Sequence, residues 1–146
     1  MHFKRILLII GTAIALSSPV YAKEIAIIVG KNHPLTHVSA AELADIYLGN
    51  KEVAGKVRLK PIDQRDGQEI HSAFLKKVLR MSHDDYVEYW NHRLFREGGT
   101  PPILKGDSTE VIRSVEEKEG AIGYVWASEG RDDDNVRILL TIDTHE

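Results

Sequence analysis

The sequence contains no cysteine in its 146 residues. It therefore offers no thiol for a disulfide bond, a thiolate metal site or nucleophilic catalysis. Basic residues are not in excess either, because 19 Lys and Arg residues stand against 22 Asp and Glu residues and the formal net charge is −3. Nucleic-acid phosphates are usually held by clustered Lys and Arg side chains. The composition therefore predicts a fold stabilised by packing and no nucleic-acid partner.

Sequence motifs of common enzymes are also lacking. The chain has no serine-centred elbow, no HExxH pair and no P-loop lysine motif. The neighbouring carboxylates Asp84 and Asp85 are expected to be solvated. We therefore predict that the protein is not an enzyme and that it needs no cofactor. Hydrolysis of a phosphate ester is the weakest of the functions considered.

A long apolar run occurs only at the N-terminus. Lys4 and Arg5 precede the apolar stretch 6–16, and the small-residue exit 20–22 follows it. These three parts are typical of a secretory signal peptide cleaved after Ala22. The alternative is a membrane anchor, but a spanning helix needs about 20 apolar residues. We expect a signal peptide at residues 1–22, a periplasmic location and a single domain at residues 23–146.

Strand and helix patterns alternate along the rest of the chain. The β-branched run from Glu24 to Gly30 predicts a buried strand. Ser39 with Glu42 three residues later predicts the start of a helix that ends at Gly49. Further strands are expected at 56–62, 120–126 and 136–142, and further helices at 66–79, 82–95 and 107–120. This order predicts an α/β fold with a mixed sheet flanked by helices.

The polar turn from Asp63 to Gln68 follows one of these strands and leads into a helix. A strand, a tight turn and a helix start together aim free backbone N–H groups at an anion. Asp66 is placed to cap this helix, and Glu69 stands where a capping box would use it. The turn therefore predicts either an anion site or an ordinary capped helix start.

A second helix start has similar chemistry. Lys105 and Gly106 precede the hydroxyl residues Ser108 and Thr109, which could receive an anion at the helix N-terminus. Plain capping is the favoured interpretation here, because Asp107 and the glutamate three residues after it already suit that role.

Histidines and aromatic residues also attract attention. Glu88 and His92 have a ligand-compatible spacing on a predicted helix, and His33 and His37 are four residues apart around a proline. Neither pair has an evident third ligand, so no metal site is expected. The aromatic residues at 86–95 predict a core stripe, with a protein-docking surface as the alternative.

Three segments in this order resemble a known family. "ELADIYLGN" at 42–50, the strand–Asp–Gly–helix turn, and "GAIGYVWAS" at 120–128 are similar to segments of the phosphate-binding proteins of bacterial ABC transporters, the PstS-like periplasmic binding proteins. The similarity spans about residues 24–140. It implies a type II periplasmic-binding-protein lobe, non-covalent binding of phosphate or a related oxyanion, and delivery to an ABC permease. Family members have two lobes, and this chain resembles mainly one of them.

The phosphate turn departs from the family pattern. Relatives read Arg-Ser-Asp-Gly-Ser-Gly-Thr, and in this chain Asp66 and Gly67 match in place. Gln64 replaces the arginine, with Arg65 beside it, and Glu69 replaces a glycine. Two unit charges about 4 Å apart repel by about 1 kcal/mol in water and about 4 kcal/mol at a protein surface. The helix dipole contributes only about 0.3–1 kcal/mol, so the Glu69 charge opposes tight phosphate binding.

The candidate ligand residues follow from these two helix starts. They are Gln64, Arg65, Asp66, Gly67, Gln68, Glu69, Ser108 and Thr109. The alternative function is a periplasmic adaptor or sensor module that uses the reduced binding fold for protein–protein interaction.

Overall fold

The computed structural model describes residues 23–131 and 133–145. The predicted signal peptide, residues 1–22, lies outside the described residues. Within the described ranges, no helix has the length and apolar character that crossing a membrane requires.

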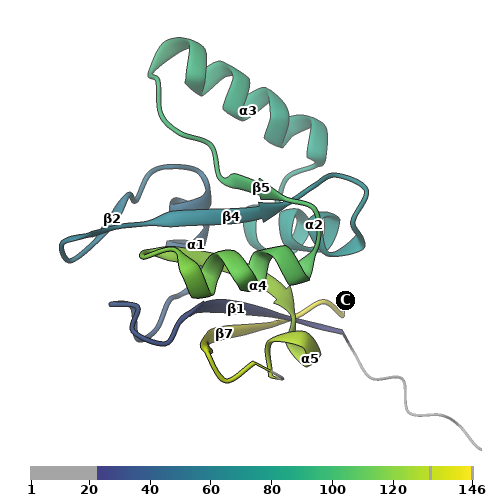
Figure 1. Ribbon diagram of the computed structural model, residues 1–146. Coiled ribbons are helices and arrows are strands. Elements are labelled where there is room, and N and C mark those ends of the chain that lie inside the picture. The colour runs from purple at the N-terminus through teal and green to yellow at the C-terminus, as the bar shows by residue number, and fades with distance from the viewer. Residues whose placement is uncertain (1–22, 132, 146) are drawn as a thin grey trace, which may run out of the picture.

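A five-stranded mixed sheet forms the centre of the fold (Figure 1). Its strand order is β5-β4-β6-β1-β7, and β1 is antiparallel to both of its neighbours while β4 is parallel to both of its own. These strands are β1 (Glu24–Gly30), β4 (Lys60–Gln64), β5 (Ile103–Lys105), β6 (Ala121–Trp126) and β7 (Val136–Asp143), and a hairpin of β2 (Val53–Ala54) and β3 (Val57–Arg58) stands beside them. The predicted mixed α/β architecture is confirmed.

Helices cover both faces of the sheet. One face packs against α1, α2, the π-helix η1 and the buried side of α3, and the other packs against α4 and α5. The helices are α1 (Ala40–Tyr47), α2 (Glu69–Phe74), η1 (Leu75–Leu79), α3 (His83–Arg96), α4 (Ser108–Glu117) and α5 (Ala127–Gly130). Side chains of β1 alternate between the two faces, as period-two geometry requires: Ile25 and Ile27 enter one core, and Ala26 and Ile28 enter the other.

The predicted helix starts at Ser39 and Ser82 are confirmed. Each hydroxyl oxygen accepts a hydrogen bond from the backbone N–H three residues later, at 3.1 Å in both cases. This local bond satisfies one of the free amides of a first helical turn. Both helix starts are therefore fixed by contacts within four residues of sequence.

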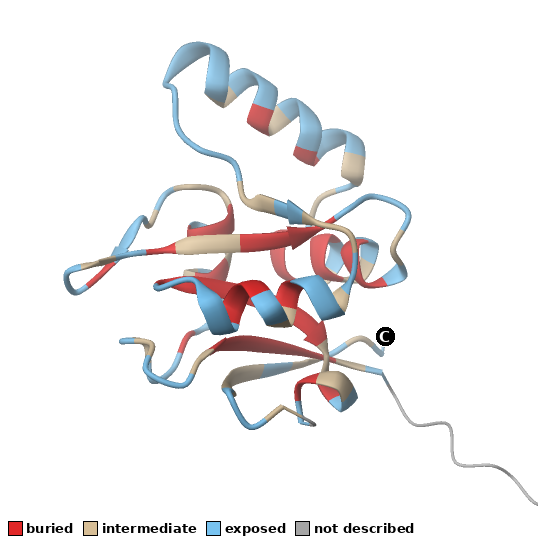
Figure 2. Ribbon diagram, in the orientation of Figure 1, coloured by how far each residue is buried: buried red, intermediate tan, exposed pale blue. Residues whose placement is uncertain are grey.

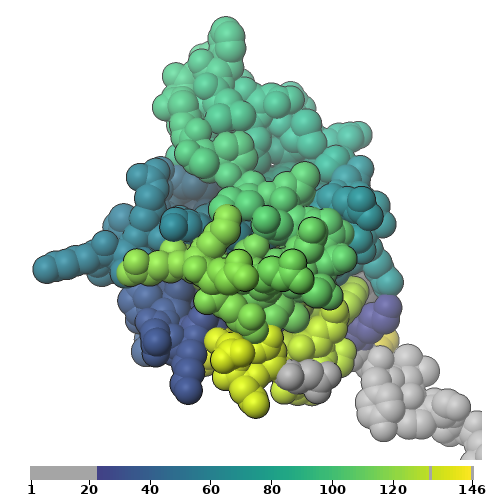
Figure 3. Space-filling model, viewed as in Figure 1, coloured from purple at the N-terminus to yellow at the C-terminus, as the bar shows by residue number. Residues whose placement is uncertain are grey.

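Helix α3 stands apart from the sheet at the top of Figure 1 and forms the protruding upper end of the surface in Figure 3. Figure 2 shows it as mostly exposed. Tyr86 and Trp90 are buried, in agreement with the predicted core stripe, whereas Phe95 is 91% exposed. The aromatic stripe is therefore core in part, and its last member faces solvent.

Candidate functional site

Strand β4 carries two polar residues into the interior at its carboxyl end. Asp63 and Gln64 were expected in the polar turn, but they are the last residues of β4, and they are 4% and 1% exposed. They are buried because β4 lies between β5 and β6, with the neighbouring helices above and below the sheet. The turn proper runs from Arg65 to Gln68, with Gly67 in the left-handed region at a φ of +93°.

The predicted capping of α2 by Asp66 is wrong. Residue Gln68 is the N-cap of α2, and no described side chain bonds to the helix start as a cap. The Asp66 carboxylate has other partners: its Oδ1 accepts from the Gly67 N–H at 2.9 Å, and its Oδ2 lies 3.4 Å from His83 Nε2. Among the described residues, no side chain therefore caps the backbone amides in the first turn of α2.

The predicted capping-box role of Glu69 is also wrong. Its Oε2 lies 3.1 Å from Lys23 Nζ, and both side chains are more than half exposed. The carboxylate turns outward because a cation on a distant segment attracts it, and it does not return to its own helix start. Its negative charge nevertheless remains beside the turn.

The two predicted helix starts form one region. Gln64 Nε2 donates to Ser108 Oγ at 3.2 Å and to Tyr124 O at 3.0 Å, and Gln68 Nε2 donates to Gly106 O at 2.7 Å. The sequence placed these stretches about forty residues apart, and the parallel pairing of β4 with β5 brings them together. The side-chain amide of Gln64 therefore already donates to groups of the protein itself.

Groups of the protein also occupy the start of α4. Asp107 Oδ1 accepts from the Glu110 N–H at 2.9 Å, and Glu110 Oε2 accepts from the Gly106 N–H at 2.6 Å. Ser108 Oγ donates to Glu129 Oε1 at 3.2 Å, while Thr109 is exposed. The capping interpretation of this helix start is confirmed, because the Asp107 and Glu110 carboxylates already accept from backbone amides that an anion would need.

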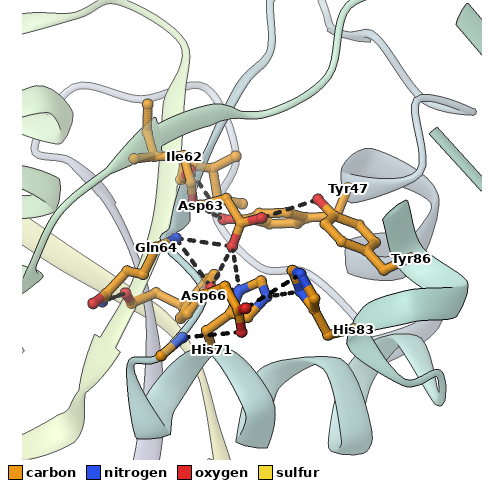
Figure 4. Close-up of polar contacts among 11 residues, drawn as sticks. Tyr47, Ile62, Asp63, Gln64, Asp66, His71, His83 and Tyr86 are labelled. Atoms are coloured by element: carbon orange, nitrogen blue, oxygen red, sulfur yellow. Dashed lines mark hydrogen bonds and ion pairs between the residues drawn. The ribbon is translucent and has the colours of Figure 1, made fainter. Parts of the chain in front are cut away.

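Asp63 is the centre of a buried polar network that sequence reasoning missed (Figure 4). Its Oδ1 accepts from the Gln64 N–H at 2.8 Å and from the Tyr124 hydroxyl, and it lies 3.1 Å from His71 Nδ1. Its Oδ2 accepts from the Tyr86 hydroxyl at 3.0 Å. A buried carboxylate needs such donors to offset its lost hydration. The only signal in the sequence was an aspartate directly after an apolar strand.

Burial and the Asp63 charge act together on the two phenols. Burial is the larger cause and the nearby carboxylate the second, and both raise the pKa of Tyr124 and the pKa of Tyr86. Desolvation disfavours a phenolate, and a neighbouring negative charge disfavours it further. Both hydroxyls therefore stay protonated and donate to Asp63.

The network continues outward through two histidines. His71 Nε2 lies 3.1 Å from His83 Nδ1, and His83 in turn reaches Asp66. Among the described residues, Asp66, His71 and His83 form the one group of three side chains placed closely enough to share a metal ion. The pairs that the sequence suggested, His33 with His37 and Glu88 with His92, do not belong to it.

The fold matches solved structures of bacterial binding proteins. A protein from Clostridium perfringens assigned as a phosphate ABC transporter substrate-binding protein, with bound phosphate, has a TM-score of 0.63 and 23% identity over 81% of this chain. An ABC-type phosphate transport receptor from Vibrio cholerae has a TM-score of 0.63 and 14% identity over 80% of this chain. PstS from Borrelia burgdorferi has a TM-score of 0.62 and 16% identity over 81% of this chain. This chain has a periplasmic-binding-protein-like fold.

The chain spans only about half of the structures that it matches, namely 45%, 45% and 47% of their lengths. No protein-family profile and no curated protein matches the sequence. At these identities the likeness establishes the fold. It does not identify a ligand for this chain, because one fold can host many functions.

Proposed function

We propose that the protein is a periplasmic solute-binding module that binds phosphate or a related oxyanion non-covalently and weakly. The ligand would lie at the turn from Gln64 to Glu69, with Ser108 and Thr109 at its border. Export would depend on the signal peptide predicted at residues 1–22. The observation that carries the proposal is the start of α2, where no described side chain caps the backbone amides. Amides at a helix start are ready donors to an anion.

The charges at the turn explain why weak binding is expected. Arg65 is exposed beside the helix start and can approach an anion, whereas Asp66 and Glu69 add negative charge. The repulsion of one carboxylate at about 4 Å, about 1–4 kcal/mol, equals or exceeds the dipole contribution of about 0.3–1 kcal/mol. Lys23 offsets part of the Glu69 charge through their 3.1 Å contact.

Isothermal titration with sodium phosphate tests this proposal. Glu69→Gln should tighten binding by about 5-fold, because about 1 kcal/mol of repulsion is removed. Arg65→Ala should weaken binding, and Arg58→Ala is the matched control, since Arg58 precedes β4 while Arg65 follows it at the other end of the strand. Absence of heat with both phosphate and sulfate, or equal losses in the two arginine variants, would refute the proposal.

A protein-interaction role is the second candidate, and α3 favours it. Phe95 is 91% exposed, Leu94 43% and Val87 41%. Leu94 and Phe95 follow Val87 by seven and eight residues, so the three side chains share one side of α3, a helix that Figure 2 shows as mostly exposed. Exposed apolar clusters of this kind often mark interaction sites. The partner would be an ABC permease or another envelope protein. Loss of an envelope-protein partner on Phe95→Asp, without any anion binding by the parent protein, would favour this role.

A further inference from the structure

We propose that Asp66, His71 and His83 bind a divalent transition-metal ion of the zinc class. The ligand atoms of these side chains lie within 4.8 Å of one another. They come from three elements: the turn after β4, helix α2 and the first residue of α3. The site shares Asp66 with the turn of the anion proposal, but it differs in using two imidazole nitrogens, of His71 and His83, that the anion site does not involve.

The orientation of His71 prepares one ring nitrogen for a metal. Its Nδ1 lies 3.1 Å from the Asp63 carboxylate, which can only accept, so the ring proton is assigned to Nδ1. Nε2 then carries a lone pair and points at His83 (Figure 4). A histidine that binds a metal commonly donates its other ring N–H to a carboxylate, which fixes the ring and raises its basicity. Asp63 supplies this support from the buried core.

When the His71 and His83 rings are both neutral, His83 has too few protons to donate to both of its neighbours. Its Nδ1 faces His71 Nε2, and its Nε2 faces Asp66 Oδ2, so two acceptors compete for one N–H. A bound cation removes this conflict. Two nitrogens held at 2.0–2.1 Å by a tetrahedral zinc ion are about 3.3 Å apart, which is close to the 3.1 Å between His71 Nε2 and His83 Nδ1.

The exposed ligands, Asp66 and His83, can move to complete the site. The Asp66 side chain is 63% exposed and the His83 side chain 37%, while His71 is 2% exposed. One ligand is thus fixed by the core, and the others can adjust around an ion that arrives from solvent. His83 also borders a surface hollow of about 520 Å³ that Ser72 and Ser82 help to line. Three protein ligands leave a fourth position for water.

The donor set indicates the kind of ion. Two imidazoles and one carboxylate suit Zn²⁺, Co²⁺, Ni²⁺ or Cu²⁺, whereas Mg²⁺ and Ca²⁺ prefer oxygen ligands. The ion would tie the projecting helix α3 to the turn after β4. Binding should therefore raise the thermal stability of the protein.

The experiment is titration of a tag-free, EDTA-treated and dialysed protein with ZnCl₂ in phosphate-free buffer, followed by calorimetry and thermal unfolding. One Zn²⁺ per chain should bind and raise the melting temperature, and MgCl₂ should do neither. His83→Gln and Asp66→Asn should each weaken Zn²⁺ binding by at least about 10-fold, because loss of even an outer-shell partner of a ligand typically costs about 10- to 100-fold. His92→Gln is the matched control, because His92 is an exposed histidine on the same helix.

Three results would overturn the site: no Zn²⁺ binding, binding that His83→Gln leaves unchanged, or a loss that His92→Gln reproduces. His83 is used in preference to buried His71, so that the variant keeps its fold, and circular dichroism verifies this. The phosphate titration is carried out separately with EDTA present. Failure of either proposal is thereby distinguishable from failure of the other.

Discussion

Replacement of Gly120 by alanine gives the sharpest test of how the turn between α4 and β6 is built. Gly120 has a φ of +80°, and a Cβ at this position would lie 2.0 Å from the backbone oxygen of Arg58. Gly55 is a matched control, because it also has a positive φ, of +60°, but a Cβ there meets no atom within 4 Å. The two substitutions therefore differ in steric contact and share the backbone strain.

The magnitudes follow from these geometries. A left-handed non-glycine residue costs about 1–2 kcal/mol, and alanine recovers about 0.4–1 kcal/mol by restricting the unfolded chain. We expect Gly55→Ala to cost about 1 kcal/mol or less. Gly120→Ala adds an overpacking cost of about 1–3 kcal/mol, because the crowding atom is backbone next to β4 and the Gly120 oxygen accepts from the Lys60 N–H at 2.9 Å.

Urea denaturation followed by tryptophan fluorescence measures the difference. With a slope of about 1–3 kcal/mol per molar urea, Gly120→Ala should lower the midpoint by about 1 M more than Gly55→Ala does. Circular dichroism before denaturation confirms that both variants are folded. Equal midpoints in the two variants would show that the turn relaxes freely and would refute the reasoning.

Two further predictions concern buried polar groups. The Tyr47 hydroxyl donates to the buried Ile62 carbonyl at 2.7 Å, so Tyr47→Phe should lower the free energy of unfolding by about 1–2 kcal/mol; an unchanged urea midpoint would contradict this. Burial is the main cause that lowers the pKa of His33 below 6.5, and the nearby Arg137 charge adds to it. The unfolded chain then binds this proton first, so stability should fall as the pH drops below 6.5. The midpoint should decrease less between pH 7.5 and pH 5.5 in His33→Gln than in the parent, and parallel decreases would exclude His33 as the cause.

Local patterns in the sequence were enough for the fold class and for several helix starts. Ser39, Ser82 and Asp107 each cap a helix through an amide three residues away, so residue type and spacing nearly determine the contact. The long strands were equally readable. Strand β2, strand β5 and helix α5 were not predicted, and β3 was predicted only as part of one strand at 56–62, because segments of two to four residues are too short to show a period.

What the sequence by itself determined is therefore the alternation of strands and helices, the absence of thiol chemistry and the location of a polar turn before α2. The tertiary structure alone decided the chemistry of that turn. Asp63 and Gln64 were predicted to lie in a polar turn, yet they end β4 and the strands beside it bury them. Lys23 draws Glu69 away from its helix, and packing brings His71 to His83. Such contacts join residues 12 to 61 positions apart, and no local preference of the chain encodes them.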